Sequence, residues 1–322
     1  MAARSDAVVE EPLRLFLDPE HLTEVADRHR EAYSTARPFP HAVLDGLFPD
    51  DVLDAVVADF PAPDSAVWKE YENFHERKLE TQGEAHLDPD VSMLLYQFNS
   101  APFLQFLERL TGIKQLLPDP YFTGGGLHQI VPGGKLGIHA DFSKHERLPL
   151  HRRLNVLVYL NRDWREEYGG ALELWTPDGS ECAERILPLF NRTVVFTITD
   201  WSYHGHPEPL TCPDGMTRKS IALYYFTVDR PEGEVQKGKN ATLFIRRPGE
   251  AVPAGTVFSR DDWDGFKGTA PPSRRVRVQR ASKTAVRRIT PPIVLDWVRA
   301  LRRRGRDGRA QAPAAGVAPG SG

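Results

Sequence analysis

The chain has few cysteines and no long hydrophobic run. Of its 322 residues, only Cys182 and Cys212 are cysteines, which is too few for a disulfide scaffold, and they do not have the close spacing of a zinc-binding pair. No segment approaches the roughly 20 consecutive apolar residues of a membrane-spanning helix. The first residues, Met1–Asp6, lack the apolar core of a secretion signal. We therefore expect a soluble, cytoplasmic protein.

Acidic residues are scarce near the C-terminus. The net formal charge is −3, but the segment Arg274–Arg309 contains 13 basic residues and two acidic ones, which leaves 28 basic and 42 acidic residues elsewhere. Such a segment is typical of binding to nucleic acid or to an anionic surface. The alternative, which we favour, is an amphipathic basic helix over Pro291–Arg304 that docks on the acidic body. The stretch 310–322 is rich in Ala, Pro and Gly and is predicted to be disordered.

The middle of the chain consists of short β-forming runs separated by turns that contain Gly-Gly, Pro-Gly-Gly and Pro-Asp-Gly. Many short strands at such close spacing indicate a sandwich or a barrel. The predicted strands are Leu127–Val131, Leu136–His139, Leu154–Leu160, Ala171–Trp175, Thr193–Thr199 and Ser220–Val228.

One of these strands ends in a candidate metal site. His139 and Asp141 are two residues apart, so their side chains point to the same face of a strand. His204, which follows several further strands, supplies a second imidazole. Two histidines and one carboxylate on one face of an octahedron leave the other positions open, as non-heme Fe(II) oxygenases require. His86 and Asp88 have the same spacing but lie among acidic residues and proline, and we interpret them as part of a solvated loop.

Two assignments have an alternative, namely the second histidine ligand and the basic residue inside the barrel. His206 shares the strand face of His204 and is a rival ligand; otherwise we expect a partly exposed wall residue. Arg218 and Lys219 are adjacent, so strand alternation sends only one of them into the barrel. A guanidinium grips a carboxylate through two parallel hydrogen bonds, which a lysine cannot do. We therefore favour Arg218, with the hydroxyl of Ser220 on the same face.

The segment from about Tyr121 to Arg230 resembles the catalytic domain of prolyl 4-hydroxylases, including the oxygen-sensing prolyl hydroxylases and their bacterial relatives. The residues that carry this resemblance are Tyr159-Leu-Asn161, Trp164, Gly169-Gly170, His204-Gly-His-Pro-Glu-Pro209 and Arg218-Lys-Ser220. One departure is an insertion, Thr211–Thr217, which lengthens the gap between the histidine and the arginine.

The resemblance implies a fold and a site. The fold is α+β with a mainly β catalytic core, a double-stranded β-helix of the jelly-roll or cupin-like kind, buttressed by N-terminal helices. The resemblance also favours His204 over His206 as the second histidine ligand of Fe(II), beside His139 and Asp141. The far carboxylate of 2-oxoglutarate is then held by Arg218, with the hydroxyl of Tyr159. Trp201, Tyr203 and His206 are candidates for the substrate mouth.

The implied activity is that of a dioxygenase that uses Fe(II), 2-oxoglutarate and O2, with ascorbate as reductant. It hydroxylates an unactivated C–H bond of a peptide, a protein or an amino acid and releases succinate and CO2. Two other functions stay open, namely oxidation of a small biosynthetic metabolite and a non-catalytic barrel that binds a ligand. A further alternative, which we do not favour, is an oxygenase that acts on a nucleic-acid base and binds nucleic acid through the basic segment.

The expected organisation has four parts. Residues 1–117 form a helical support, residues 118–231 the dioxygenase barrel, residues 232–309 an extension with the basic helix, and residues 310–322 a tail. Within the first part, apolar periodicity predicts helices over Pro19–Ala36 and Asp50–Phe60, and a third between Ser100 as N-cap and Gly112. Pro40–Phe48 reads as a strand. The polar stretch Trp68–His86 has no clear period and is a candidate mobile lid over the metal.

Overall fold

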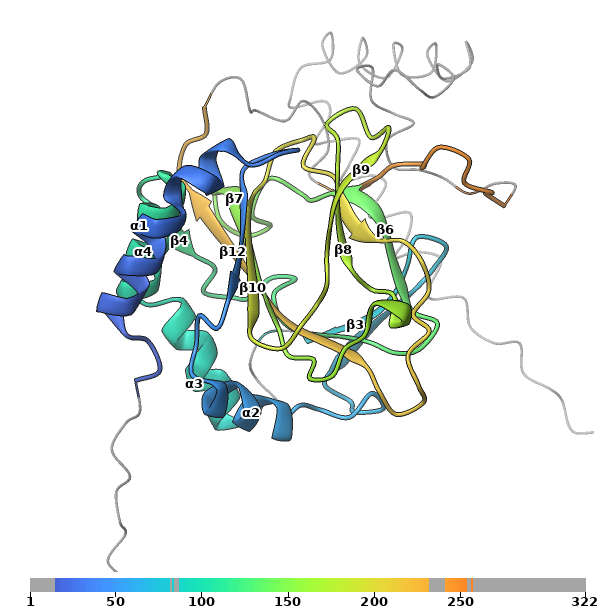
Figure 1. Ribbon diagram of the computed structural model, residues 1–322, viewed down its shortest axis with the longest axis horizontal. Coiled ribbons are helices and arrows are strands. Elements are labelled where there is room, and N and C mark those ends of the chain that lie inside the picture. The colour runs from blue at the N-terminus through green and yellow to red at the C-terminus, as the bar shows by residue number, and fades with distance from the viewer. Residues whose placement is uncertain (1–14, 82, 84–86, 232–240, 254–255, 257–322) are drawn as a thin grey trace, which may run out of the picture. The chain divides into compact units, whose positions relative to one another are not determined.

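The computed structural model describes residues 15–81, 83, 87–231, 241–253 and 256 (Figure 1). The basic helix predicted at Pro291–Arg304 and the tail predicted at 310–322 lie outside these residues, as does His86. Within the described ranges, no helix is both long and apolar enough to cross a membrane. Cys182 and Cys212 are both free thiols.

The described residues form four α-helices, a short 3-10 helix and thirteen strands. The helices are α1 (Pro19–Thr35), α2 (Asp50–Ala58), α3 (Pro89–Phe98) and α4 (Ala101–Thr111), with the 3-10 turn at Glu166–Tyr168. The first strands are β1 (His41–Asp45), β2 (Trp68–Glu72), β3 (Glu76–Thr81), β4 (Leu117–Pro118), β5 (Gly126–Ile130) and β6 (Lys135–Ala140). They are followed by β7 (His151–Tyr159), β8 (Leu172–Trp175), β9 (Cys182–Ile186), β10 (Arg192–Thr197), β11 (His204–His206), β12 (Arg218–Thr227) and β13 (Leu243–Phe244).

The strands pair into one antiparallel sheet that curves around a cavity. Their hydrogen-bonded order is β1-β10-β7-β12-β5-β3-β6-β11-β8-β9, with β2 added to β3, β13 to β6 and β4 to β12. In Figure 1, β7, β10 and β12 stand on one side and β6, β8 and β9 on the other, with β3 below. Residues from both sides line the cavity. The predicted fold, a mainly β double-stranded β-helix with N-terminal helices, is confirmed.

Strand alternation separates the core from the cavity. In β7, Leu154, Val156 and Val158 belong to the large apolar core, whereas Asn155 and Leu157, between them, line the cavity. In β12 the same alternation puts Ile221, Leu223 and Tyr225 into the core and Arg218, Ser220, Ala222 and Tyr224 into the cavity. One face of each strand therefore anchors it to the helices, and the other face is free to carry polar groups.

The helices cover the outer face of this sheet (Figure 1). Helices α1 and α4 place Leu22, Phe103 and Leu107 in the core that also contains the outer residues of β7. The helices predicted from the sequence match α1, α2 and α4 to within two residues at each end. Ser100 is the N-cap position of α4, although its hydroxyl donates to the Gln97 carbonyl instead of capping the helix. Gly112 ends α4 in the left-handed conformation at φ 75°, where glycine is favoured.

Residues 68–81 of the candidate lid segment Trp68–His86 form a hairpin, and its role as a lid stays a prediction. Strands β2 and β3 pair with each other, and β3 also pairs with β5 and β6. Asp88 is exposed and outside the helices and strands, as expected of a solvated loop, and its carboxylate caps α3 by accepting from the Asp90 backbone N–H at 2.9 Å. β13, from beyond residue 240, pairs Phe244 with His139 of β6.

Candidate metal centre and adjoining pocket

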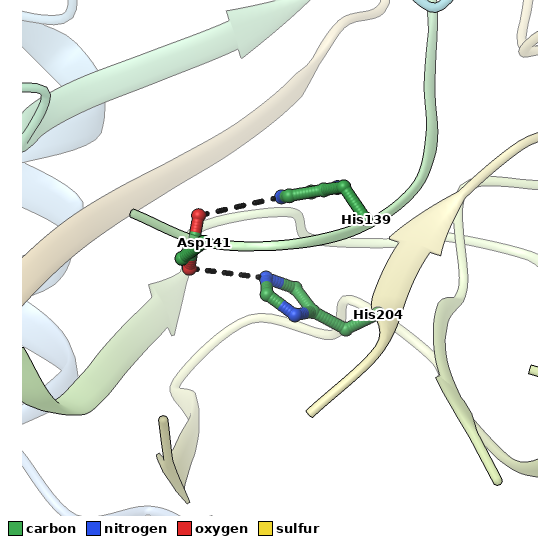
Figure 2. Close-up of side chains that lie close together, drawn as sticks. All are labelled: His139, Asp141 and His204. Carbon is green, nitrogen blue, oxygen red and sulfur yellow. Dashed lines mark ion pairs between the residues drawn. The ribbon is translucent and has the colours of Figure 1, made fainter. Parts of the chain in front are cut away.

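Three side chains with nitrogen and oxygen ligand atoms converge where β6 and β11 pair (Figure 2). His139 and His204 are opposite each other on the two strands, and their ring centroids are 4.4 Å apart. Asp141 follows the end of β6. One of its carboxylate oxygens lies 3.4 Å from His139 Nε2 and the other 3.4 Å from His204 Nε2. Each of the three residues offers one ligand atom, and these atoms all lie within 4.8 Å of one another.

The hydrogen bonds of both imidazoles leave their Nε2 atoms available to a metal. His139 Nδ1 lies 2.8 Å from the Gly137 carbonyl oxygen, and His204 Nδ1 lies 2.9 Å from that of Ser202. Because a carbonyl oxygen only accepts, each Nδ1 carries a proton and each neutral ring keeps its lone pair on Nε2. Burial lowers the pKa of His204 to about 4. Two imidazole lone pairs and a carboxylate thus face one point, and a cation at that point satisfies all three.

The spacing of these atoms suits a divalent metal. Metal–ligand bonds of about 2.1 Å at right angles put neighbouring ligand atoms about 3 Å apart, close to the 3.4 Å between Asp141 and each imidazole. The same separation is longer than an ordinary N–H···O hydrogen bond. The donor set therefore fits the predicted Fe(II), and the assignment of His139, Asp141 and His204 as its ligands stays a prediction that this geometry supports.

Asp141 is held in place by two residues of β7. Its Oδ2 accepts hydrogen bonds from Arg152 Nη2 at 3.0 Å and from Asn155 Nδ2 at 2.7 Å. Arg152 is fully buried against the rings of Phe142 and Tyr224. Burial alone raises the pKa of Asp141, but the charge of Arg152 and the two imidazoles outweigh it and lower the pKa well below its usual range. The carboxylate is therefore ionised at neutral pH, as a metal ligand must be.

A buried arginine that has no counter-ion among the described residues lines the same cavity. Arg218 Nε donates to the Gly170 carbonyl at 2.8 Å, and Nη2 donates to the Tyr159 hydroxyl oxygen at 3.2 Å. Both partners are neutral, and within the described part of the chain no carboxylate pairs with Arg218. Burial lowers the pKa of Arg218, but an arginine remains charged. A buried unpaired cation is unfavourable, so the cavity is suited to an anionic ligand.

Two glycines allow this close packing. A Cβ on Gly170 would lie 2.6 Å from Leu210 Cδ2 and 3.0 Å from Arg218 Cδ, and its φ of +71° disfavours other residues. A Cβ on Gly205 would lie 2.7 Å from the Gly137 carbonyl oxygen and 2.8 Å from that of Leu136. The first glycine lets Arg218 reach its position, and the second lets β11 approach β6.

The other predicted site residues divide between the cavity and the core. Ser220 lines the cavity beside Arg218, whereas Lys219 points to the other face, where its Nζ donates to Thr217 Oγ1 at 2.7 Å. Tyr203 is not at a mouth, because it is fully buried in an apolar cluster outside the cavity lining, with Trp201 packed against that cluster. Strand alternation explains this correction, since Tyr203 precedes the inward-facing His204.

His206 also differs from its expectation. It is buried, with 3 % of its surface exposed, and it lines the cavity instead of standing partly exposed at the rim. Burial and then the charge of Arg218 lower the pKa of His206 well below its usual range. It is not part of the group of convergent ligand atoms formed by the other two histidines and Asp141.

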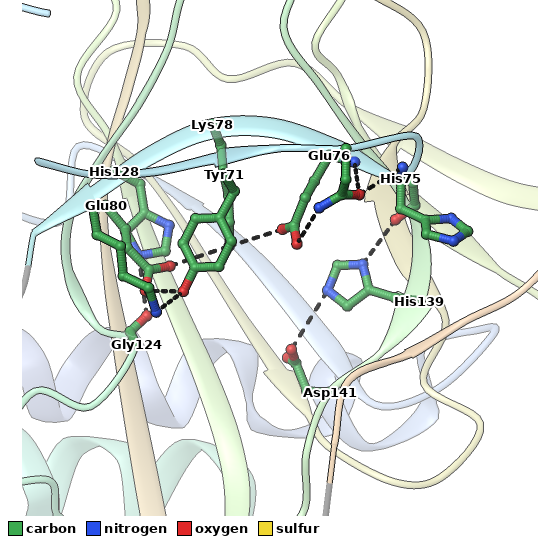
Figure 3. A network of polar contacts seen from close by, with 12 residues as sticks. Tyr71, His75, Glu76, Lys78, Glu80, Gly124, His128, His139 and Asp141 are labelled. Carbon is green, nitrogen blue, oxygen red and sulfur yellow. Dashed lines mark hydrogen bonds and ion pairs between the residues drawn. The ribbon is translucent and has the colours of Figure 1, made fainter. Parts of the chain in front are cut away.

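Charged residues of β3 form a wall beside the metal centre that the sequence analysis did not predict (Figure 3). Lys78 Nζ of β3 lies 3.2 Å from Glu80 Oε2 and 3.5 Å from Glu76 Oε2, and the Tyr71 hydroxyl donates to Glu80 Oε1 at 2.7 Å. Burial opposes both charges, but mutual attraction raises the pKa of Lys78 and lowers that of Glu80. Next to them, burial and the charge of Lys78 lower the pKa of His128 to about 4, so the wall combines an ion pair with a neutral imidazole.

Comparison with known proteins agrees with this site. Residues 125–226 match the family described as the 2OG-Fe(II) oxygenase superfamily. A curated relative, the prolyl hydroxylase EGLN3 of Mus musculus, is 27% identical over 92 residues, which cover 28% of this chain and 36% of the mouse protein. The chain thus aligns with about a third of that relative's length.

Two solved structures of prolyl hydroxylases are similar to part of this chain. One from Trichoplax adhaerens, in complex with a hypoxia inducible factor peptide fragment, matches with 17% identity and a TM-score of 0.49 over 64% of this chain and 91% of that one. A prolyl-4-hydroxylase from Pseudomonas putida matches with 16% identity and a TM-score of 0.43 over 64% and 98%. The matched segment, residues 125–226, spans the His-x-Asp strand, the distal histidine and the arginine strand, so this part of the chain is similar to the 2OG-Fe(II) oxygenase superfamily and, over 92 residues, to a prolyl hydroxylase.

Proposed function

We propose that this protein is an Fe(II)- and 2-oxoglutarate-dependent dioxygenase that hydroxylates an unactivated C–H bond and releases succinate and CO2. One observation carries the proposal. A single cavity contains three convergent metal-ligand side chains and a buried guanidinium that has no counter-ion among the described residues. A ligand with a metal-chelating end and a carboxylate at its other end satisfies both features, and 2-oxoglutarate has this structure.

The chain's own residues position the reactants. His139, Asp141 and His204 hold the metal on one face, and Arg152 and Asn155 fix the orientation of the carboxylate through their hydrogen bonds. Iron and 2-oxoglutarate, once bound, supply the activation of O2 and the oxidative decarboxylation that drives hydroxylation.

At the other end of the cosubstrate, Arg218 donates to the far carboxylate. Its Nη2 already donates to the Tyr159 oxygen, which leaves the Tyr159 O–H free to donate to the same carboxylate. Ser220 contributes a further hydroxyl from the same face of β12. The apolar side chains of Leu157, Leu172 and Ile130 also line the cavity and exclude water from the methylene groups between the two ends.

The wall formed by Lys78, Glu80 and Tyr71 supports a polar primary substrate. Lys78 lines the cavity next to the metal ligands and, with its acidic partners, offers both donors and acceptors to a substrate that enters beside the metal. We propose a peptide, a protein loop or an amino acid as substrate, in line with the prolyl hydroxylase resemblance. Ascorbate as reductant and a cytoplasmic location, which favours Fe(II), belong to the same proposal.

Succinate release tests the function. Purified protein incubated with Fe(II), ascorbate, 2-oxoglutarate and O2 should form succinate slowly even without primary substrate. His139→Ala should abolish this turnover, because one of three ligands is lost. The matched control is His21→Ala, which removes an exposed histidine of α1 and should leave the rate unchanged. Undiminished succinate formation by His139→Ala would contradict the proposed metal centre.

A further inference from the structure

His206 is a buried polar side chain that the proposed chemistry does not yet use. Only 3 % of its surface is exposed, and neither Nδ1 nor Nε2 has a hydrogen-bond partner among the described residues. Leaving a buried donor or acceptor unpaired is unfavourable by roughly 1 to 3 kcal/mol. Buried polar groups are nearly always satisfied, so an imidazole in this state is suited to a ligand that enters the cavity.

The position of His206 puts it near the arginine end of that cavity. It follows His204 by two residues on β11, so both rings face inward. His204 pairs with His139, whereas His206 pairs with Leu136, with a bulge between the two pairs. β11 is antiparallel to β8, with His204 opposite Leu174 and Gly205 opposite Glu173, so His206 lies towards Gly170, whose carbonyl accepts from Arg218 Nε. The ring therefore lies on the arginine side of the metal centre.

His206 is not a second-choice metal ligand. Within the described residues, the buried group of convergent ligand atoms is that of His139, Asp141 and His204, and the pairing with Leu136 places His206 three residues of β6 away from His139. An imidazole away from the metal carries at least one N–H donor, whichever tautomer it adopts. That donor requires an acceptor on the ligand.

The far carboxylate of the cosubstrate supplies such an acceptor. Two carboxylate oxygens offer about four lone-pair sites. Arg218 and Ser220 of β12 line the cavity, Tyr159 of β7 accepts from Arg218, and His204, Gly205 and His206 of β11 line the cavity as well. A donor on β11 would reach a carboxylate held between the two sides, and His206 is a polar side chain of that strand whose ring nitrogens no described residue satisfies.

We propose, on the basis of the function proposed above, that His206 is a further cosubstrate-binding residue whose ring N–H hydrogen-bonds the far carboxylate of 2-oxoglutarate beside Arg218. This contact gives the neutral and the cationic donor complementary roles. Arg218 supplies the charge, and His206 fixes the orientation of the carboxylate from the opposite side of the cavity.

Binding without turnover tests this contact. Calorimetry on Mn(II)-loaded protein under anaerobic conditions would compare 2-oxoglutarate with 2-oxopentanoate, which has the same metal-chelating end but a methyl group in place of the far carboxylate. His206→Leu should weaken 2-oxoglutarate binding roughly tenfold or more, as expected for a lost hydrogen bond to a charged group. Binding of 2-oxopentanoate should change by less than about twofold. His206→Gln, which keeps a donor, should recover part of the lost affinity.

The outcomes separate the two proposals. If the wild-type protein does not bind 2-oxoglutarate in a metal-dependent way, the proposed function fails, and this contact with it. If the wild-type protein binds and His206→Leu binds equally well, only the His206 contact is refuted. Equal weakening of both ligands together with a lower Tm would refute it too, because it would show a structural role. The proposed contact instead requires an unchanged or higher Tm in His206→Leu, since this substitution removes two unpaired polar atoms from the interior.

Discussion

Arg218 links the fold to the chemistry through a single side chain. Its guanidinium is buried and, among the residues that the structure describes, donates only to the neutral oxygens of Gly170 and Tyr159. Desolvating a cation without a counter-ion opposes folding, so the free energy of unfolding is lower than it would be with an apolar side chain at this position. A buried cation of this kind is expected where an anion binds. Arg218 therefore lowers the stability of the ligand-free protein and raises its affinity for an anionic ligand.

Arg218→Met should therefore separate stability from binding. Methionine fills a similar volume without a charge, so the Tm of the metal-free protein should be unchanged or higher. The affinity for 2-oxoglutarate should fall by roughly a hundredfold, because truncating one partner of a buried charge pair removes about 2 to 5 kcal/mol. Arg218→Lys should be intermediate, since it retains the charge but loses the paired donors. Thermal unfolding and calorimetry would measure both effects; a lower Tm with unchanged affinity would show that the guanidinium is structural.

The alternation of strand residues predicted which side chains point into the cavity, but it did not predict which residues they contact there. Strand alternation correctly puts Arg218 inside and Lys219 outside. The same rule puts Asn155 on the inner face with Tyr159, four residues away, yet a lone asparagine in an apolar strand does not reveal that it binds Asp141. Arg152 also belongs to this network, and its role depends on β6 and β7 being brought together by the whole fold.

At the scale of elements, the metal centre depends on the approach of β11 to β6. These strands carry His204 and His139 opposite each other, and Gly205 between the two inward-facing histidines lies against the backbone of β6. Backbone carbonyl oxygens cannot move aside as a flexible side chain can. The absence of a side chain at position 205 is therefore a condition for the spacing of the three ligand atoms.

Gly205→Ala should weaken metal binding although it changes no ligand. The added Cβ would lie within 3 Å of two carbonyl oxygens of β6, so the strands must separate, with a loss of roughly 1 to 3 kcal/mol of stability as for other overpacked sites. Metal titration and thermal unfolding would both report the change. Gly215→Ala is the matched control, because a Cβ there meets nothing within 4 Å. It should lose stability only through its positive φ and should bind metal normally; equal metal affinity in the two variants would contradict this role of Gly205.

The hairpin of β2 and β3 shows why some elements escape sequence patterns. Its inner face carries Tyr71, Lys78 and Glu80 because that face borders a polar cavity, so the usual alternation of apolar and polar residues is missing. Leu79 is buried on the opposite face, but one residue does not define a period. β12 also carries polar cavity residues, but its other face keeps an apolar alternation at Ile221, Leu223 and Tyr225, and most of that strand was predicted. The hairpin thus escaped the sequence pattern because neither of its strands has such an alternation.

For the molecule as a whole, the candidate ligands come from segments far apart in the chain and meet only in the folded state. Asp141 and His204 are separated by more than 60 residues of sequence, and β7, β8, β9 and β10 lie between them along the chain. An unfolded chain holds these groups apart, so it binds a metal much more weakly. Metal binding and folding are therefore linked, and the linkage reports the site without requiring knowledge of the primary substrate.

Metal addition should raise the Tm of the protein, and a chelator should reverse the effect. At a free Mn(II) or Fe(II) concentration about 100 times Kd under anaerobic conditions, binding adds about 2.7 kcal/mol to the free energy of unfolding, which corresponds to a rise of roughly 5 to 10 °C for a domain of this size. 2-Oxoglutarate should raise the Tm further only when metal is present, because its chelating end requires the metal. His139→Ala should show neither shift, whereas His21→Ala should show both. A metal-induced shift of wild-type size in His139→Ala would place the bound ion elsewhere in the molecule.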